Sequence, residues 1–209
     1  MNKRQKKKQL KMKNKKLVKQ YPFMLPRSVW TGKVVRDYDY TWTEYDCLLK
    51  GWQIGFGKFW LQDLKEACEK TGFTNKLFFS QIKEKYGQLR QYNFGAPQEV
   101  HDVIRKYEYI SQYVCCYCGS PEATIVDDYG WYLPVCSCCW EKNNKRRLAT
   151  GYSFIRPWEE VAELNNVGLP DSYTVEHMSK EGSWHETIDI SETSNKIWDA
   201  YRKRKKNHG

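Results

Sequence analysis

The chain has 209 residues, which is enough for one domain with a substantial core or for two small domains. No apolar run approaches the 18 residues that a membrane span needs, and no apolar segment follows the basic N-terminus as it would in a secretory signal. We therefore expect a cytoplasmic protein without membrane contact. In that compartment thiols stay reduced, and clustered cysteines bind metal more often than they form disulfides.

The net charge of +10 is concentrated at the two ends of the chain. Of the 35 Lys and Arg residues, ten lie in residues 1–20 and five in residues 202–206, which leaves 20 bases against 25 acids in residues 21–201. Basic tails are typical of nucleic-acid-binding proteins, although solvated arms that only aid solubility have the same composition. The predicted nucleic-acid-binding residues are Lys3, Arg4, Lys6, Lys7, Lys8, Lys11, Lys13, Lys15, Lys16, Arg202, Lys203, Arg204 and Lys205.

In chain order, residues 1–20 contain no acid to pair with their lysines, so we expect a disordered basic arm. Residues 21–114 form a predicted α+β domain. Its aromatic residues follow helical spacing over 58–71, the sequence alternates over 79–92 as in two strands joined near Tyr86–Gly87, and helical spacing returns from Pro97 to Val114. The aromatic stripe of the first helix is interpreted as core, which is its commoner role.

Residues 148–209 follow the cysteine-rich segment as a predicted C-terminal region. It begins with a short helix near Pro157 and continues with a β-hairpin over 171–190, turning at Lys180–Glu181–Gly182. His177 and His185 fall on opposite arms of this hairpin, where we expect them to face each other as a structural pair. A final helix is predicted with Ser191 or Thr193 as its N-cap.

Residues 115–147 hold two Cys-x₂-Cys pairs, Cys115 with Cys118 and Cys136 with Cys139, separated by seventeen residues. This spacing predicts a zinc ribbon whose four thiolates bind one structural Zn²⁺, with an iron–sulfur cluster as the rival occupant. Residues 130–136 are predicted as a strand entering a second knuckle. A site with four protein ligands has no open position for water, so the metal would stabilise the fold rather than act in catalysis.

The other four cysteines are not expected to bind the ion. Using Cys116 or Cys138 would leave one residue between two ligands, which is poor geometry for a shared ion, so both are interpreted as bystanders or as thiols that surround the ligands without binding the ion. Cys47 and Cys68 are interpreted as small core residues. The fold class is thus α+β: a small mixed helix and hairpin domain with an inserted four-cysteine zinc ribbon and a C-terminal hairpin plus helix.

No catalytic motif is present among those we sought, including the P-loop, the nucleophile elbow and the zinc-protease and zinc-deaminase signatures. We therefore expect a protein that is not an enzyme. The remaining enzymatic alternative is a metal-dependent nuclease that uses a cluster of acids near the N-terminus. Those acids are Asp37, Asp39, Glu44 and Asp46.

Part of the chain resembles phage- and prophage-encoded zinc-ribbon accessory proteins, including those of low-GC Gram-positive hosts. The resemblance covers residues 50–140: Gly51–Trp52 before a helix, the hairpin Gln81–Tyr92, a further helix, and the C-x-x-C-G…G-W…C-x-x-C segment from Cys115 to Cys139. It implies the same four metal ligands and a phage accessory role in the cytoplasm of the host cell. We expect a non-catalytic protein that binds nucleic acid or a host ribonucleoprotein, or alternatively an anti-CRISPR-like inhibitor of a host defence complex.

Overall fold

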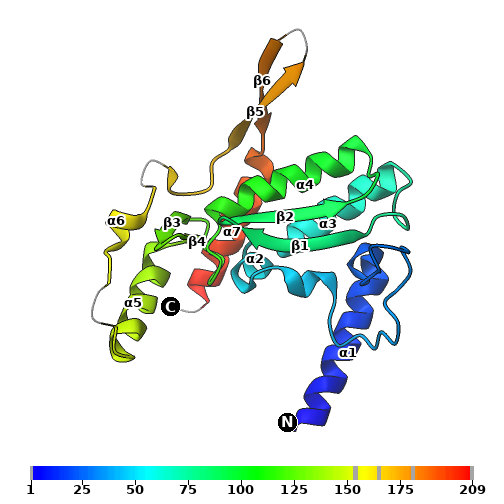
Figure 1. Cartoon of the computed structure of the whole chain (residues 1–209), viewed down its shortest axis with the longest axis horizontal. Helices are drawn as coiled ribbons and strands as arrows, with labels where there is room; N and C mark the ends of the chain where they lie inside the picture. Colours follow the sequence, from blue (N-terminus) through cyan, green and yellow to red (C-terminus); the bar gives the residue numbers. More distant parts are fainter. Residues whose placement is uncertain (1, 153–154, 164–165, 180–181, 208–209) are drawn as a thin grey trace. The chain divides into compact units, whose positions relative to one another are not determined.

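The computed structural model describes residues 2–152, 155–163, 166–179 and 182–207. Over these ranges it confirms a mixed α+β protein in which three antiparallel hairpins form three separate two-stranded sheets (Figure 1). The chain divides into two compact units, Met1–Leu49 with Gly57–Glu108 and Lys50–Phe56 with Tyr109–Gly209. Across the described ranges, no helix is at once long and apolar enough to cross a membrane.

The first unit contains α1 (Lys3–Gln20), α3 (Gly57–Lys70), the β1–β2 hairpin (Phe79–Lys85 and Gln88–Asn93) and most of α4 (Gln98–Ile110), with short 3₁₀ turns at Pro22–Met24 and Glu44–Cys47. The predicted hairpin and both predicted helices are confirmed, and α3 buries the aromatic stripe as expected. Trp60 is fully buried, its ring lies 6.0 Å from that of Phe79 between centroids, and it donates its indole N–H to the Gln91 side chain at 2.8 Å. The helix, both strands and their polar partner thus share one core.

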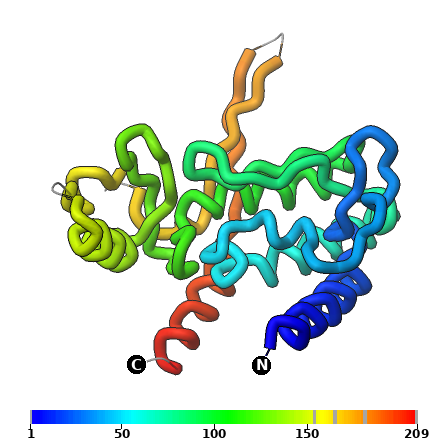
Figure 2. Tube along the Cα trace, turned by 60° about the horizontal axis from the view of Figure 1, so that its bottom comes forward, coloured from blue at the N-terminus to red at the C-terminus, as the bar shows by residue number. Residues whose placement is uncertain are grey.

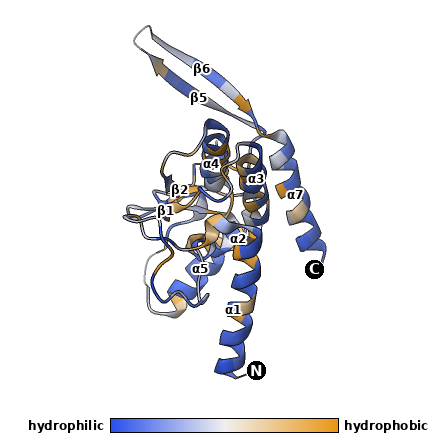
Figure 3. Ribbon diagram, turned by 90° about the vertical axis from the view of Figure 1, so that its right-hand side faces the viewer, coloured by the Kyte–Doolittle hydropathy of each residue, from blue (hydrophilic) through white to orange (hydrophobic). Residues whose placement is uncertain are grey.

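Residues 1–20 are helical, so the expected disorder of this arm is corrected. Asn2 caps α1 with a capping box. Three contacts then fix the helix to the first unit: Val18 is buried, the Asn14 amide donates to the Tyr40 carbonyl at 2.9 Å, and Lys11 pairs with Asp39 at 2.7 Å. Residues 11, 14 and 18 lie on one face of the helix. Because lysines surround this narrow stripe in the sequence, the pattern did not predict that it would be buried. Figure 3 shows α1 as hydrophilic along most of its length.

The second unit contains α2 (Lys50–Gly55), β3 (Thr124–Asp128), β4 (Trp131–Val135), α5 (Ser137–Ala149), α6 (Trp158–Val161), β5 (Ser172–Ser179), β6 (Gly182–Asp189) and α7 (Ser191–Lys206), with a 3₁₀ turn at Ser111–Tyr113. The helix near Pro157, the hairpin and the final helix are confirmed. Trp52 of α2 is fully buried and donates its indole N–H to the Val114 carbonyl at 3.0 Å. Helix α2 is thereby attached to the segment that leads into the cysteines.

None of the other described strands pairs with the β5–β6 hairpin, and Figure 2 traces it as a narrow two-stranded arm. Its register pairs His177 with Trp184 and His185 with Glu176, so the expected pairing of the two histidines is wrong. The His177 ring stacks on Trp184 with centroids 4.9 Å apart, and its Nε2 lies 2.8 Å from Glu186. Lys180 and Glu181 of the predicted turn lie outside the described residues.

Helix α7 begins without the hydroxyl cap that the sequence suggested. Its N-cap is Ile190, and the Asp189 carboxylate accepts the N–H of Ser191 at 2.8 Å. Thr193 and Ser194 are buried instead of capping the helix, and Ile197 is fully buried. The carboxylate of Asp189, one residue before the N-cap, therefore accepts a helical N–H that a serine or threonine hydroxyl was expected to accept.

Candidate metal centre

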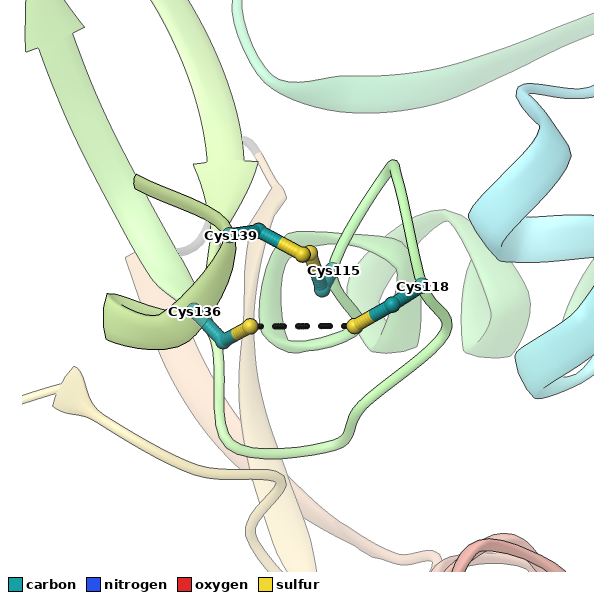
Figure 4. Close-up of side chains that lie close together, drawn as sticks. All are labelled: Cys115, Cys118, Cys136 and Cys139. Atoms are coloured by element: carbon teal, nitrogen blue, oxygen red, sulfur yellow. Dashed lines mark hydrogen bonds between the residues drawn. The ribbon is translucent and has the colours of Figure 1, made fainter. Parts of the chain in front are cut away.

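The structure brings together the four cysteines that were predicted to bind metal. The sulfurs of Cys115, Cys118, Cys136 and Cys139 all lie within 4.8 Å of one another, and those of Cys118 and Cys136 are 3.7 Å apart (Figure 4). Within the described ranges this is the one group of three or more Cys, His, Asp or Glu side chains close enough to share an ion.

A tight loop presents the first pair. The Gly119 N–H donates to the Cys115 carbonyl at 2.9 Å, and the Cys115 N–H donates to the Ser120 carbonyl at 2.8 Å. Gly119 has φ +72°, the left-handed conformation that glycine adopts without strain, and a Cβ there would lie 2.6 Å from the Gly51 carbonyl oxygen. Glycine is thus required both for the turn and for the approach of α2.

The second pair lies on a helix, so the expected second knuckle is corrected. The strand before it is confirmed as β4, but Cys136 is the N-cap of α5 and Cys139 lies in its first turn. The segment from Ser137 to Ala149 lacks a strong apolar stripe, so no helix was predicted there. Because the N-terminal end of a helix carries partial positive charge, this placement favours thiolates at the metal site.

The sulfur spacing fits a single tetrahedral ion. Four thiolates bound at about 2.3 Å would stand about 3.8 Å apart along each edge of the tetrahedron, close to the 3.7 Å between Cys118 and Cys136. The thiols also perturb one another: hydrogen bonds with Cys118, Cys136 and Cys139 lower the pKa of Cys115, while the hydrogen bond with Cys115 raises the pKa of Cys136. A cation bound among the four sulfurs would favour the thiolate form of all of them.

The neighbouring cysteines lie outside the group, as predicted. Cys116 is buried, and its backbone N–H donates to the Pro134 carbonyl at 2.8 Å, which joins the loop to β4. Cys138 is exposed on the first turn of α5. Cys68 is buried as expected, whereas Cys47 is exposed and is therefore not a core residue.

The acids that might have served a nuclease are held in separate interactions. Asp39 pairs with Lys11, Asp46 caps the turn that starts at Thr43, and Glu44 is buried and accepts from the Cys47 thiol. Asp37 carries a weak contact with Arg36 at 3.8 Å and is 92% exposed. They do not converge on a common ion.

The predicted nucleic-acid-binding residues fall into two different settings. The bases of α1 are exposed or half-buried along the helix. At the other end, Arg204 of α7 is half-buried and donates to the carbonyls of Ile54 at 3.2 Å and Gly119 at 3.1 Å, and Arg202 pairs with Asp199. Arg204 thus holds α7 to α2 and the first cysteine loop, and its guanidinium serves the fold of the second unit.

A groove of about 690 Å³ runs beside α1 and was not anticipated from the sequence. Its rings, Tyr38 and Tyr40, have centroids 4.8 Å apart, and the Lys15 ammonium lies 5.1 Å from the centre of the Tyr40 ring. Burial raises the pKa of Tyr38 to about 12, so this ring is neutral at physiological pH. The groove is lined by Arg4, Lys7, Lys8, Lys11, Met12, Lys15, Tyr38, Asp39 and Tyr40.

The tyrosines follow an alternation in "DYDYTW", which was the available signal, but nothing local indicated that α1 would lie beside them. No family model, curated protein or solved structure matches the chain. What can be inferred about function therefore comes from the cysteine group and the groove beside α1.

Proposed function

We propose that this is a non-catalytic accessory protein that binds nucleic acid, free or within a nucleoprotein complex, and that one structural Zn²⁺ stabilises its second unit. The observation that carries the proposal is the groove beside α1. Five basic side chains, two tyrosine rings and a single acid line it. That combination suits a strand whose phosphates need cations and whose unpaired bases need aromatic faces.

Zinc is the ion that best fits the cysteine group. Four thiolates select zinc or an iron–sulfur cluster, but sulfurs that all lie within 4.8 Å of one another leave room for a single ion rather than for several irons with bridging sulfides. With all four positions taken by protein, no site remains for an activated water. The metal's contribution is then to folding, which in small zinc peptides amounts to about 10–16 kcal/mol of apparent binding energy.

The charge of α1 gives the proposed contact its strength. The helix has ten bases and no acid over 18 residues, a length of about 27 Å. The acid that meets it in the groove is Asp39, which accepts from Lys11 at 2.7 Å and lies 4.0 Å from Lys7. The Lys11 and Thr41 hydrogen bonds hold the pKa of this carboxyl well below its usual range. Asp39 therefore fixes the helix and leaves most of its positive charge available to phosphate.

The salt dependence of binding tests this proposal with a matched pair of variants. The first carries Arg4→Gln, Lys8→Gln and Lys15→Gln, three groove-lining residues; the second carries Lys6→Gln, Lys13→Gln and Lys16→Gln, which lie on the same helix but do not line the groove. Each loses three charges, and Lys11, which fixes the helix, is kept in both. Fluorescence anisotropy with a labelled single-stranded oligonucleotide is measured from about 50 to 200 mM salt.

Each neutralised phosphate contributes about −0.7 to the log–log slope on a single strand, so the groove variant should lose about two units of slope. The control variant should lose clearly less. Equal losses would show that the helix acts only as a diffuse charge and that the groove has no role. Unchanged binding in both variants would show that α1 does not bind the oligonucleotide.

The resemblance to phage accessory proteins suggests that the protein acts in the cytoplasm of an infected host. Inhibition of a host defence ribonucleoprotein is its narrower form, since such a complex presents RNA phosphates. Affinity purification from host lysate, with and without nuclease, separates the two. Recovery of one defence complex that survives nuclease supports inhibition, and recovery of bulk nucleic acid alone supports the broader form.

A further inference from the structure

The β1–β2 hairpin of the first unit has one buried face and one exposed face. Ile82 and Leu89 belong to the buried face, and Leu89 is fully buried. Cross-strand partners share a face and successive residues alternate, so the side chains between these form the opposite face, which we call the outer face. Each of them is exposed or half-buried. The outer face consists of Gln81, Lys83, Lys85, Gln88, Arg90 and Tyr92.

The outer face is basic, with three cations among its six side chains and no acid. Two neighbouring acids are engaged in the fold. The carboxylate of Glu84, on the buried face, accepts the Gly87 N–H at 2.6 Å. Glu108 of α4 accepts the Gln91 N–H at 2.7 Å and lies 3.8 Å from Arg90, and its side chain is only 15% exposed. The outer face therefore presents positive charge to a ligand.

Two exposed tyrosine rings lie among these cations. Tyr92 of the outer face is 43% exposed, and Tyr86 at the turn is 71% exposed. The Lys83 ammonium lies 5.2 Å from the centre of the Tyr92 ring, and the Lys85 ammonium lies 5.3 Å from the centre of the Tyr86 ring. Both rings border one hollow of about 420 Å³, which is lined by Lys85, Tyr86, Arg90, Gln91, Tyr92 and Glu108.

Tyr86 stands where the turn itself favours another residue. Tyr86 and Gly87 form the two-residue turn between Lys85 and Gln88, with φ of +54° and +77°. Such a turn favours Asn, Asp or Gly at its first position, because other side chains are strained in the left-handed region. The ring is mostly exposed, so its burial offsets little of that strain. A tyrosine here suits contact with a ligand better than it suits the turn.

The β3–β4 hairpin has the same kind of turn in a different electrostatic setting. Tyr129 occupies its first position with φ +55° and is 63% exposed. The two residues before Tyr129 are aspartates, whereas the residue before Tyr86 is a lysine. Arg156 lies 5.4 Å from the centre of the Tyr129 ring, so one cation is set against two carboxylates there. The cations around Tyr86 are thus what distinguish it from another turn tyrosine.

We propose that the outer face of β1–β2 is a second contact site for single-stranded nucleic acid. Unpaired bases stack on the Tyr86 and Tyr92 rings, and Lys83, Lys85 and Arg90 bind phosphates of the same strand. Binding moves each lysine from a ring to a phosphate, which its flexible stem allows. The proposal rests on the proposed nucleic-acid function and adds a preference for single strands, because the bases of a duplex are already stacked. The lining of the hollow and that of the groove beside α1 share no residue.

Replacing Tyr86 with a residue that the turn favours separates a ligand contact from a structural role. Tyr86→Asn removes the ring and relieves the turn, so thermal unfolding should show a protein at least as stable as the wild type. In fluorescence anisotropy its affinity for a labelled single-stranded oligonucleotide should fall about tenfold, as on loss of one stacked base, and its affinity for the corresponding duplex should change less than about twofold. Tyr129→Asn makes the same exchange in the other turn and should leave both affinities unchanged.

A second pair of variants tests the cations of the outer face. Lys83→Gln combined with Lys85→Gln should reduce the log–log salt slope on the single strand by about 1.4, at about 0.7 for each phosphate contact. Lys58→Gln combined with Lys70→Gln is the control, because these two exposed lysines lie on α3 of the same unit. The control should reduce the slope clearly less.

Unchanged single-strand affinity in Tyr86→Asn would overturn the inference, as would an equal loss in Tyr129→Asn or an equal loss on the duplex. A Tyr86→Asn protein less stable than the wild type, or equal slopes in the two lysine variants, would also contradict it. In each case a salt slope that still depends on Arg4, Lys8 and Lys15 would leave the proposed function standing. Loss of that dependence, with the hairpin variants behaving as expected, would instead show that the groove beside α1 is not a binding site.

Discussion

At the scale of single residues, two exposed cysteines, Cys118 and Cys138, are predicted to differ in whether they bind the metal ion. Cys118 is part of the four-sulfur group although its residue is exposed, and Cys138 is exposed and outside it. Exposure alone therefore does not separate a ligand from a bystander. What separates them is position: Cys118 belongs to the first loop, and Cys138 lies on the turn of α5 between two ligands.

Replacing these two exposed cysteines in turn tests the assignment. Cys118→Ser should weaken metal binding by more than the roughly 10–100-fold that follows loss of a residue supporting a ligand. Cys138→Ser should retain the metal of the wild-type protein. Competition with a chromophoric chelator measures both affinities, and equal weakening in the two variants would show that the register of the ligands is wrong.

The buried carboxyl of Glu44 should make the stability of the first unit depend on pH. Its carboxyl is buried, and burial raises its pKa above the ordinary value, against a smaller lowering by the Cys47 thiol. A raised pKa in the folded state means that the folded protein binds the proton more tightly, so its stability falls as pH rises through that range. Glu44→Gln, which stays neutral, should therefore stabilise the first unit at pH 7.

The stabilisation by Glu44→Gln should disappear at acid pH, below the ordinary pKa of glutamate, where both states of the wild-type protein carry the proton. Urea unfolding at a series of pH values measures it. Asp37→Asn removes a carboxylate that is 92% exposed and serves as the control with little effect. A Glu44→Gln variant less stable than wild type at pH 7 would contradict this reading of the site.

At the scale of elements, the contact between α2 and the first cysteine loop depends on glycine. The Gly51 N–H donates to the Cys116 carbonyl at 2.7 Å, and a Cβ on Gly51 would lie 2.0 Å from the Cys115 carbonyl oxygen. Because that neighbour is the backbone of Cys115, one of the four clustered cysteines, it cannot move aside without disturbing the loop. Helix α2 thus supports the four-cysteine group across a sequence separation of more than sixty residues.

We expect Gly51→Ala to destabilise the second unit by about 1–3 kcal/mol or more, the usual cost of forcing atoms into a packed contact. It should also weaken metal retention, because the Cys115 carbonyl belongs to the loop that holds the ligands. Thermal unfolding and metal content measure the two effects. Lys50→Ala, on the exposed neighbouring residue of the same helix, should change neither, and a Gly51→Ala protein of wild-type stability would show that the contact is not tight.

Local patterns predicted the elements that local interactions determine. Alternation over 79–92 identified β1–β2, the turn predicted at 180–182 marked the β5–β6 hairpin, and the apolar stripes identified α3 and α4. The spacing of the cysteines identified the four residues that converge. These signals work because each depends on residues close together in the chain.

The features that the sequence did not predict depend on contacts between residues far apart in the chain. Helix α1 depends on Tyr40 and Asp39, which are distant in sequence, and α5 depends on the metal-centre loop and Trp140 rather than on its own apolar periodicity. The groove beside α1 combines a helix and a loop whose meeting no local pattern specifies. Pairing of His177 with Trp184 rather than with His185 was a matter of register, which a single residue changes.

At the scale of the whole molecule, the basic groove beside α1 and the four-cysteine group belong to different compact units. The first unit also holds the outer face of the β1–β2 hairpin. A chain of this size can carry two small cores, and the proposed ion would add to the stability that apolar burial gives the second. Loss of the metal should therefore unfold the second unit before it affects the first.

The central claim is that four sulfurs hold one zinc ion whose role is structural. Native mass spectrometry of the purified full-length protein, compared with its mass under denaturing conditions, measures this most directly. We predict a mass difference of one zinc per chain, and its loss on chelation should be accompanied by loss of folded structure in the second unit. A protein that carries no metal, or iron with inorganic sulfide, or that keeps its fold once stripped, would contradict the account.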